Sequence, residues 1–128
     1  MKEFQTKLGT MYFDIEFDEF KLYDSNKDYI NHDDVGCYLK DNETDITDEL
    51  LEQRIVEQYK DIDYTDSSII LLGEPVMWSD TKEGLLELWS NYCKECGDHI
   101  KWTMEDFENE IQINQIGNLY FIIYYNEY

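Results

Sequence analysis

The stretch Met11–Tyr23, "MYFDIEFDEFKLY", decides the fold class, because apolar and acidic residues alternate along it as they do along a half-buried β-strand. One face of this strand carries the apolar residues Met11, Phe13, Ile15 and Phe17. The other face carries the acidic residues Asp14, Glu16 and Asp18. The apolar residues then shift phase to Phe20 and Leu22, which predicts a long strand interrupted by a bulge or a bend.

The clearest helix is predicted from Thr47 to about Ile62. Thr47 is a residue type favoured at the N-cap, and the acidic residues that follow it suit the first turn of a helix. The apolar stripe of this helix consists of Leu51, Ile55 and Tyr59.

Two more helices are predicted in the second half of the chain. One runs from about Asp80 to Cys96, with Gly97 at its C-terminal cap. One face of it carries Leu85, Trp89, Tyr92 and Cys96. Thr103 opens a third, short helix with the sequence "MEDFENEI".

The remaining apolar runs read as strands. The segment "SSIILLG", residues 67–73, predicts a short buried strand that ends at Gly73 and Pro75. The segment "NLYFIIYYN", residues 118–126, is apolar on both faces, as a central strand is. "DVGCYLKD", residues 34–41, fits a short strand or a short helix. We therefore expect one α+β domain over residues 1–128, with two or three helices packed against a mostly antiparallel sheet.

The balance of charge is the most unusual property of the chain. It holds 30 acidic and 10 basic residues, a formal net charge of −20. With 42% hydrophobic and 16% aromatic residues, it has the composition of a folded protein rather than of a disordered acidic tail. An acidic surface repels nucleic acid and anionic membranes and attracts basic surfaces. We expect a basic protein partner, no direct binding to nucleic acid and no membrane association.

The acidic excess is concentrated between residues 14 and 66, which hold 18 acidic and 5 basic residues. Carboxylates on one face of a strand repeat every ~6.8 Å, which is close to two steps of ~3.4 Å along one DNA strand, so such a row can take the place of phosphates. Tyr29 and Tyr64, each close to acids, are candidate anchors, because tyrosine is favoured at interfaces. The predicted partner-binding residues are Asp24, Asp28, Tyr29, Asp33, Asp34, Asp41, Glu43, Asp45, Asp61, Asp63, Tyr64 and Asp66.

The segment "DSNKDYINHDD", residues 24–34, resembles an EF-hand calcium loop. Asp24, Asn26 and Asp28 match its first three ligand positions. The glycine of the sharp turn is missing, because Tyr29 stands there, and the final bidentate glutamate is replaced by Val35. The pattern favours an acidic surface loop over a calcium site.

Cysteine and histidine offer a second possible metal site. Cys93 and Cys96 form a CxxC pair followed by His99, and Cys37 or His32 is available as a fourth zinc ligand. A single CxxC within an apolar helix more often packs as small hydrophobic side chains, so we predict no metal and no cofactor. Three cysteines do not make a closed disulfide framework, and "MKEFQTKLGT" lacks the apolar core of a signal peptide, which favours a cytoplasmic location. The excess of lysine over arginine and the many Ile, Asn and Tyr residues indicate an AT-rich coding source, so we expect a bacterial or a phage-infected host cell.

Catalytic motifs are not recognisable in the sequence. It contains no nucleophile elbow, no phosphate-binding glycine loop and no HExxH pattern. Because 30 carboxylates place some pairs close together by chance, no acid pair indicates acid–base catalysis. We predict a protein that is not an enzyme.

By size and charge alone, the chain resembles two groups of proteins: phage-encoded anti-CRISPR or anti-restriction DNA mimics, and immunity proteins that neutralise nuclease toxins. This resemblance implies an acidic inhibitor that blocks the nucleic-acid site of a basic protein. The alternative is a regulatory adaptor whose interface is apolar, around Trp78, Trp89 or Trp102. Salt dependence distinguishes the two, because apolar contacts survive at high ionic strength.

Overall fold

The computed structural model describes residues 1–40, 43, 47–63 and 70–124. A four-stranded antiparallel sheet comes first in the chain, with its strands in sequence order. Its strands are β1 (Lys2–Gln5), β2 (Thr10–Glu16), β3 (Glu19–Tyr23) and β4 (Tyr29–Asp34). A short 3-10 helix, η1 (Val35–Tyr38), follows directly, which resolves the segment that fitted either a strand or a helix.

The other strands form two smaller antiparallel sheets. A three-stranded sheet has the order β7–β9–β8 and a two-stranded sheet pairs β5 with β6. The bounds are β5 (Ile70–Leu71), β6 (Glu74–Pro75), β7 (Met77–Ser79), β8 (Asn114–Ile116) and β9 (Leu119–Ile122). With the three α-helices, this confirms the α+β class and the antiparallel pairing, with the described strands divided among three sheets.

The prediction of one long strand over residues 11–23 is wrong, because the chain reverses in the middle of it. Glu16 and Glu19 are register partners across a two-residue turn made by Phe17 and Asp18. Such a turn pairs odd-numbered residues with even-numbered ones, so Phe13 lies opposite Leu22 on the same face. The phase shift in the sequence therefore marks a hairpin turn and not a bulge.

Helix α1 (Asp48–Tyr59) confirms the clearest sequence prediction, although it ends before Ile62. The Thr47 hydroxyl oxygen accepts a hydrogen bond from the backbone N–H of Leu50 at 3.2 Å. This bond satisfies one of the free donors at the helix start. The predicted stripe is buried: Leu51, Ile55 and Tyr59.

Helices α2 (Lys82–Glu95) and α3 (Met104–Glu110) begin after the threonine caps Thr81 and Thr103. Gly97 adopts a φ of 90°, as expected for the residue that ends α2. One detail of the predicted apolar face is wrong, because Cys93 is buried and Cys96 is exposed. Four residues after Trp89, Cys93 falls on the same side of the helix.

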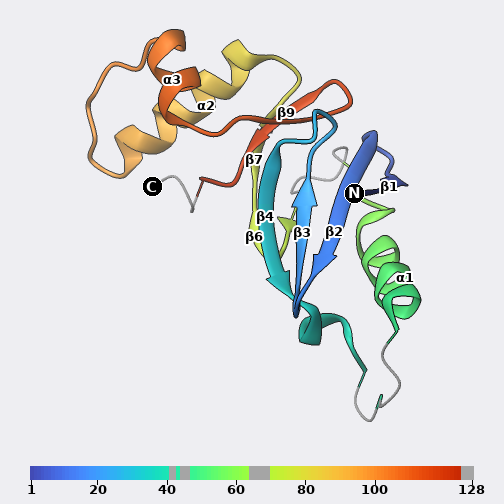
Figure 1. Ribbon diagram of the computed structural model, residues 1–128. Coiled ribbons are helices and arrows are strands. Elements are labelled where there is room, and N and C mark those ends of the chain that lie inside the picture. Colours follow the sequence, from blue (N-terminus) through green and yellow to red (C-terminus); the bar gives the residue numbers. More distant parts are fainter. Residues whose placement is uncertain (41–42, 44–46, 64–69, 125–128) are drawn as a thin grey trace.

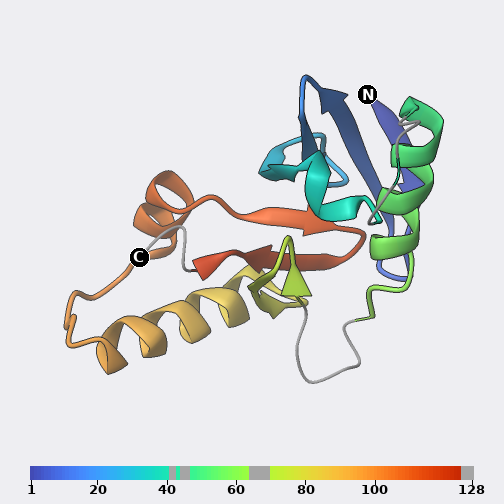
Figure 2. The same ribbon diagram turned by 90° about the horizontal axis from the view of Figure 1, so that it is seen from below.

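Strand β9 separates two hydrophobic cores. Leu119 and Phe121 belong to the core between the four-stranded sheet and α1, and Ile122 belongs to the core under α2 and α3. Figures 1 and 2 show the four-stranded sheet and α2 on opposite sides of β9. This arrangement explains why the sequence of β9 is apolar on both faces and confirms its place as a central strand.

Candidate protein-binding surface

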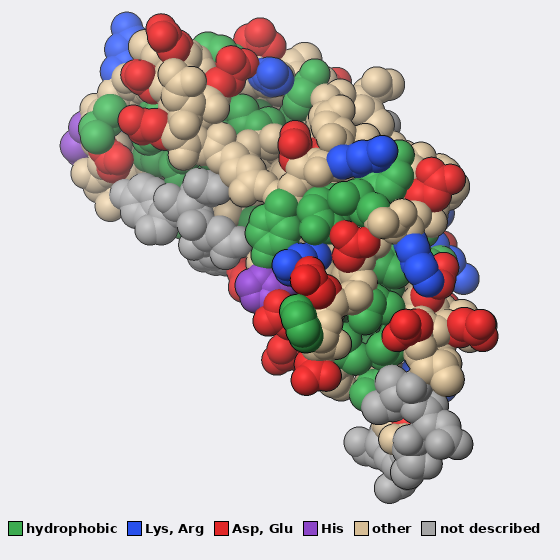
Figure 3. Space-filling view, viewed as in Figure 1, with side chains coloured by type: hydrophobic (Ala, Val, Ile, Leu, Met, Phe, Trp, Pro, Cys, Tyr) green, Lys and Arg blue, Asp and Glu red, His purple; other side chains and the backbone are tan. Residues whose placement is uncertain are grey.

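The outer face of the four-stranded sheet is turned away from the core. Alternation along β2, β3 and β4 buries one set of side chains: Met11, Phe13, Phe20, Leu22 and Ile30. The opposite set is exposed or half-buried, and we call it the outer face: Tyr12, Asp14, Glu16, Glu19, Lys21, Tyr23, Tyr29, His32 and Asp34. Figure 3 looks onto this side of the molecule, where red acidic side chains border green hydrophobic ones.

Register divides the outer face into rows that run across the strands. The row nearest the β3–β4 connection is aromatic, because Tyr12, Tyr23 and Tyr29 are successive register partners. The rings of Tyr23 and Tyr29 meet edge to face with centroids 6.0 Å apart. The Tyr29 hydroxyl lies 2.6 Å from Nδ1 of His32, and Lys27 Nζ lies over the Tyr12 ring at 5.3 Å.

The row nearest the β2–β3 turn is acidic. Glu16 is the register partner of Glu19, and Glu19 is the register partner of Asp34. Neighbouring strands lie ~4.7–4.9 Å apart, so three carboxylate-bearing residues stand side by side. Like charges directly opposite each other in a sheet are destabilising. We call these residues the carboxylate row.

Two ion pairs neutralise part of the negative charge of the outer face. Lys21 Nζ lies 3.1 Å from a carboxylate oxygen of Glu16, and this hydrogen bond raises the pKa of Lys21. The N-terminal ammonium of Met1 lies 3.2 Å from Asp14. Exposed pairs of this kind contribute little to stability. Among the described residues, no ion pair reaches Glu19 or Asp34.

Asp24 does not belong to the surface on which the sequence placed it. It is 0% exposed, and its Oδ1 accepts hydrogen bonds from the backbone N–H groups of Asn26 and Asp28 at 2.9 and 3.0 Å. Its Oδ2 accepts one from the N–H of Gln115 at 2.7 Å. Burial raises the pKa of Asp24, while these three N–H groups act in the opposite direction. Asp24 is therefore a structural residue, and its assignment as a partner-binding residue is corrected.

Three more of the predicted acids are half-buried and already have partners within the protein. Glu43 lies 2.6 Å from Arg54, and both side chains are only 18% exposed. Asp63 lies 3.8 Å from Lys7. Asp33 accepts a hydrogen bond from the Tyr38 hydroxyl at 3.4 Å on the inner side of the sheet. These carboxylates are less available to a partner than the exposed ones.

The remaining predicted residues divide into two groups. Four are exposed: Asp28, Tyr29, Asp34 and Asp61. Four others lie outside the described residues: Asp41, Asp45, Tyr64 and Asp66. The structure thus places Tyr29 and Asp34 on the same outer face, at opposite ends of β4, and leaves Asp61 beyond the end of α1.

Sequence reasoning missed Glu19, the central member of the carboxylate row. Its position depends on the two-residue turn, which places it between Glu16 and Asp34. The phase shift between Ile15 and Phe20 was the signal that could have found it, because a two-residue turn produces that shift. The same error made Asp18 a member of the strand face, whereas Asp18 lies in the turn.

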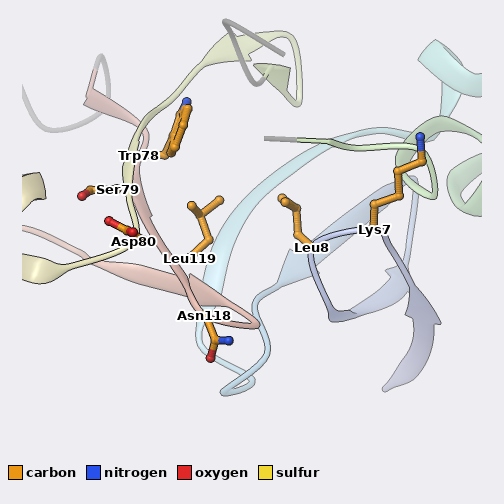
Figure 4. A pocket seen from close by; sticks show the side chains of 7 residues that line it. All are labelled: Lys7, Leu8, Trp78, Ser79, Asp80, Asn118 and Leu119. Carbon is orange, nitrogen blue, oxygen red and sulfur yellow. The ribbon is translucent and has the colours of Figure 1, made fainter. Parts of the chain in front are cut away.

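A pocket of about 440 Å³ lies between the β1–β2 connection and β7. Figure 4 shows Leu8, Trp78 and Leu119 around it, with Lys7 and Asp80 at opposite ends. Lys7 forms its ion pair with Asp63 instead of with Asp80. Acid and base are therefore not brought together around this pocket, and its lining does not form a recognisable catalytic arrangement.

The candidate metal ligands do not assemble where the structure describes them. Within residues 1–40, 43, 47–63 and 70–124, no group of three or more His, Cys, Asp or Glu residues is arranged to hold a metal ion. Both oxygens of Asp24 accept backbone N–H groups, and Tyr29–Asp34 is a strand. Cys93 is buried while Cys96 is exposed, and both are free thiols.

Comparison with known proteins gives no relative. No family model, no curated protein and no solved structure matches this chain. In the part of the chain that the structure describes, no helix is long and apolar enough to cross a membrane.

The tryptophans named for an apolar interface are largely covered. Trp89 is 2% exposed in the core under α2 and α3, which excludes it from a surface in the folded protein. Trp102 meets Trp89 edge to face with centroids 5.8 Å apart, and Trp78 packs partly against the other core. The most exposed apolar side chain among the described residues is Phe17, which lies next to the carboxylate row.

Proposed function

We propose that this protein is an acidic inhibitor that binds a basic nucleic-acid-binding protein and blocks its nucleic-acid site. The target class is a nuclease toxin or a phage-defence effector such as a CRISPR nuclease. The carboxylate row carries the proposal, because Glu16, Glu19 and Asp34 lie side by side on an uncovered sheet face. Within the fold this arrangement costs free energy, and a basic partner would offset that cost.

The rest of the outer face supports the same conclusion. The aromatic row of Tyr12, Tyr23 and Tyr29 lies on the same face, separated from the carboxylate row by the row of Asp14, Lys21 and His32, and tyrosine is enriched in protein interfaces. A net charge of −20 steers basic proteins toward this chain and speeds their encounter. Many basic surfaces exist to hold phosphates, so carboxylates that occupy such a surface exclude the nucleic acid.

The test is capture of a target from bacterial lysates that express candidate nucleases and CRISPR effectors. The tagged protein is washed at low and at high salt, and the retained proteins are identified by mass spectrometry. We expect one basic nucleic-acid-binding enzyme, released by high salt and by its own nucleic acid. Retention of a non-basic partner at high salt would support the apolar adaptor instead.

A pair of charge variants then locates the interface. The variant Glu19→Lys with Asp34→Lys changes the carboxylate row, and the control Glu105→Lys with Glu110→Lys makes the same change in charge on α3. We expect the first variant to slow association with the captured enzyme much more than the control does. Equal slowing by both variants would show that net charge, and not the outer face, determines binding.

A further inference from the structure

Phe17 is the most exposed large apolar side chain among the described residues, at 91%. It occupies the first position of the turn between β2 and β3, next to Asp18. Its φ is 59°, in the left-handed region that glycine adopts without cost and that a phenylalanine rarely adopts. The fold therefore holds an apolar side chain in water on a strained backbone. Burial of the side chain does not offset the strain, because almost none of it is buried.

A groove of about 470 Å³ begins beside Phe17 and runs between the turn, η1 and the start of α1. Its floor is apolar, with Ile15, Val35, Leu39 and Leu51. Its rim carries three carboxylates, from Asp18, Asp34 and Asp48. The described residues that line the groove include no lysine and no arginine.

The walls of this groove are held in place without a ligand. The carbonyl oxygen of Asp18 accepts a hydrogen bond from the backbone N–H of Val35 at 2.8 Å, which ties the turn to η1. Val35 and Leu51 are themselves buried. A preformed apolar groove next to an exposed aromatic side chain has the anatomy of an interface hot spot, in which an anchor and a pocket are surrounded by polar groups.

We propose that Phe17 and this groove are the point at which the basic partner docks, by inserting an apolar side chain that is flanked by lysine or arginine. Phe17 covers the inserted side chain, and Asp18, Asp34 and Asp48 contact its basic neighbours. Charge complementarity selects this occupant. A second copy of this chain is disfavoured, because it carries the same net charge of −20. The inference deepens the proposed function, since it rests on a basic partner and names its contact.

The first test uses two lysine-rich peptides of equal length and charge, one with leucine and one with serine at the central position. Each is titrated into the ¹⁵N-labelled protein at low salt. We expect the leucine peptide to shift the backbone amides of Phe17, Asp18 and Val35 and to bind about tenfold more tightly than the serine peptide. Equal affinities, or shifts that lie elsewhere, would overturn the proposal.

The second test compares Phe17→Ser with the control Ile100→Ser. Ile100 is also exposed, at 63%, but lies between α2 and α3, away from the groove. Phe17→Ser should remove the preference for the leucine peptide, and Ile100→Ser should leave it unchanged. A preference that survives Phe17→Ser would contradict the assignment. If the wild-type protein self-associates and Phe17→Ser abolishes that self-association, the occupant of the groove is a second copy of this chain. That result would overturn the assignment of the groove to a basic partner.

The peptide titration separates this inference from the proposed function. It needs no nucleic-acid enzyme, so it can succeed even where the capture experiment finds none. The capture experiment can also succeed while the groove fails. If Phe17→Ser binds a captured basic nuclease as tightly as the wild-type protein does, the inhibitor is upheld and the groove is rejected as its docking point.

Discussion

The backbone N–H of Gln115 donates a hydrogen bond to the Asp24 carboxylate at 2.7 Å, although the two residues are 91 positions apart. This bond ties the connection between β3 and β4 to β8. The Ser25 N–H reinforces it by donating to the carbonyl oxygen of Gln115 at 2.9 Å. The buried carboxylate of Asp24 thus joins the four-stranded sheet to the three-stranded sheet. The outer face lies on the first of these sheets, and the two hydrophobic cores meet at the second.

Replacing Asp24 by alanine should destabilise the protein by about 2–4 kcal/mol. The change leaves three backbone N–H groups without their acceptor in a buried site, and hydrogen bonds to a charged group are the stronger ones. Urea unfolding followed by circular dichroism measures the loss. Asp28→Asn is the control, because that side chain is exposed and should change stability by less than about 0.5 kcal/mol. Equal stability of the two variants would contradict the structural role of Asp24.

Gly117→Ala should lower the stability more than Gly73→Ala does. Both glycines have positive φ, 59° and 76°, so alanine is strained at either position. At Gly117 the new Cβ would also clash with the carbonyl oxygen of Leu8, whereas at Gly73 it meets open space. Thermal unfolding of the two variants isolates the clash where the β1–β2 and β8–β9 turns cross. Similar melting temperatures would show that the turns do not touch in solution.

The fold should weaken above pH 10 through the hydroxyl pair of Tyr38 and Tyr59, which lie 2.8 Å apart. Burial raises the pKa of both groups. Above the usual tyrosine pKa of about 10, the unfolded chain loses protons that the native state keeps. Stability then falls by up to about 1.4 kcal/mol per pH unit for each group until the raised native pKa is reached. Urea unfolding at about pH 8, 10 and 11 should show this fall in the free energy of unfolding. In Tyr38→Phe the free energy of unfolding should fall less steeply with pH. An unchanged slope in that variant would remove the pair as its cause.

Phe17→Gly should raise stability by roughly 0.5 kcal/mol. Relief of the left-handed backbone gains about 1–2 kcal/mol, and the greater freedom of glycine in the unfolded chain takes back part of it. Little burial is lost, because Phe17 is 91% exposed. Asp18→Gly, in the same turn, is the control and should lower stability, since the structure records no positive φ there. If Phe17→Gly were also less stable, the strain in the turn would be in doubt.

Glu19→Gln should stabilise the fold by about 0.2–1 kcal/mol at low ionic strength. It removes the central charge of the carboxylate row, whose register neighbours are Glu16 and Asp34. Salt screens the same repulsion, so the wild-type protein should gain stability as salt is added, and the variant should gain less. Chemical unfolding in low and high sodium chloride gives both numbers. A variant with undiminished salt dependence would show that the repulsion arises elsewhere.

Local patterns were sufficient for the helices. Thr47, Thr81 and Thr103 each accept a bond from an N–H three residues later. The sequence located the caps Thr47 and Thr103, and it placed the start of α2 within two residues, at about Asp80. The apolar stripe of α1 was also predicted, because Leu51, Ile55 and Tyr59 repeat at the four-residue spacing of one helix face. Strand β9 was also recognisable, because only a strand covered on both faces can be apolar on both.

The hairpin at Phe17 and Asp18 could not be recognised with the same ease. Sequence signals for two-residue turns rest on glycine and asparagine, and Phe17 is neither. Only the pairing of Glu16 with Glu19 shows that the strand reverses there. The phase shift between Ile15 and Phe20 fits a bulge as well as a turn, so the register was needed to place the carboxylate row and Phe17.

The sequence by itself determined the acidic character of this protein, its α+β class and the positions of its helices, because composition and short-range spacing carry that information. Only the tertiary structure decided which carboxylates face water. Asp24 is buried because its donors include Gln115, far along the chain, and Glu43 is paired because the fold brings it to Arg54. Glu19 and Asp34 are neighbours because strand register, which depends on turns and long-range packing, aligns them.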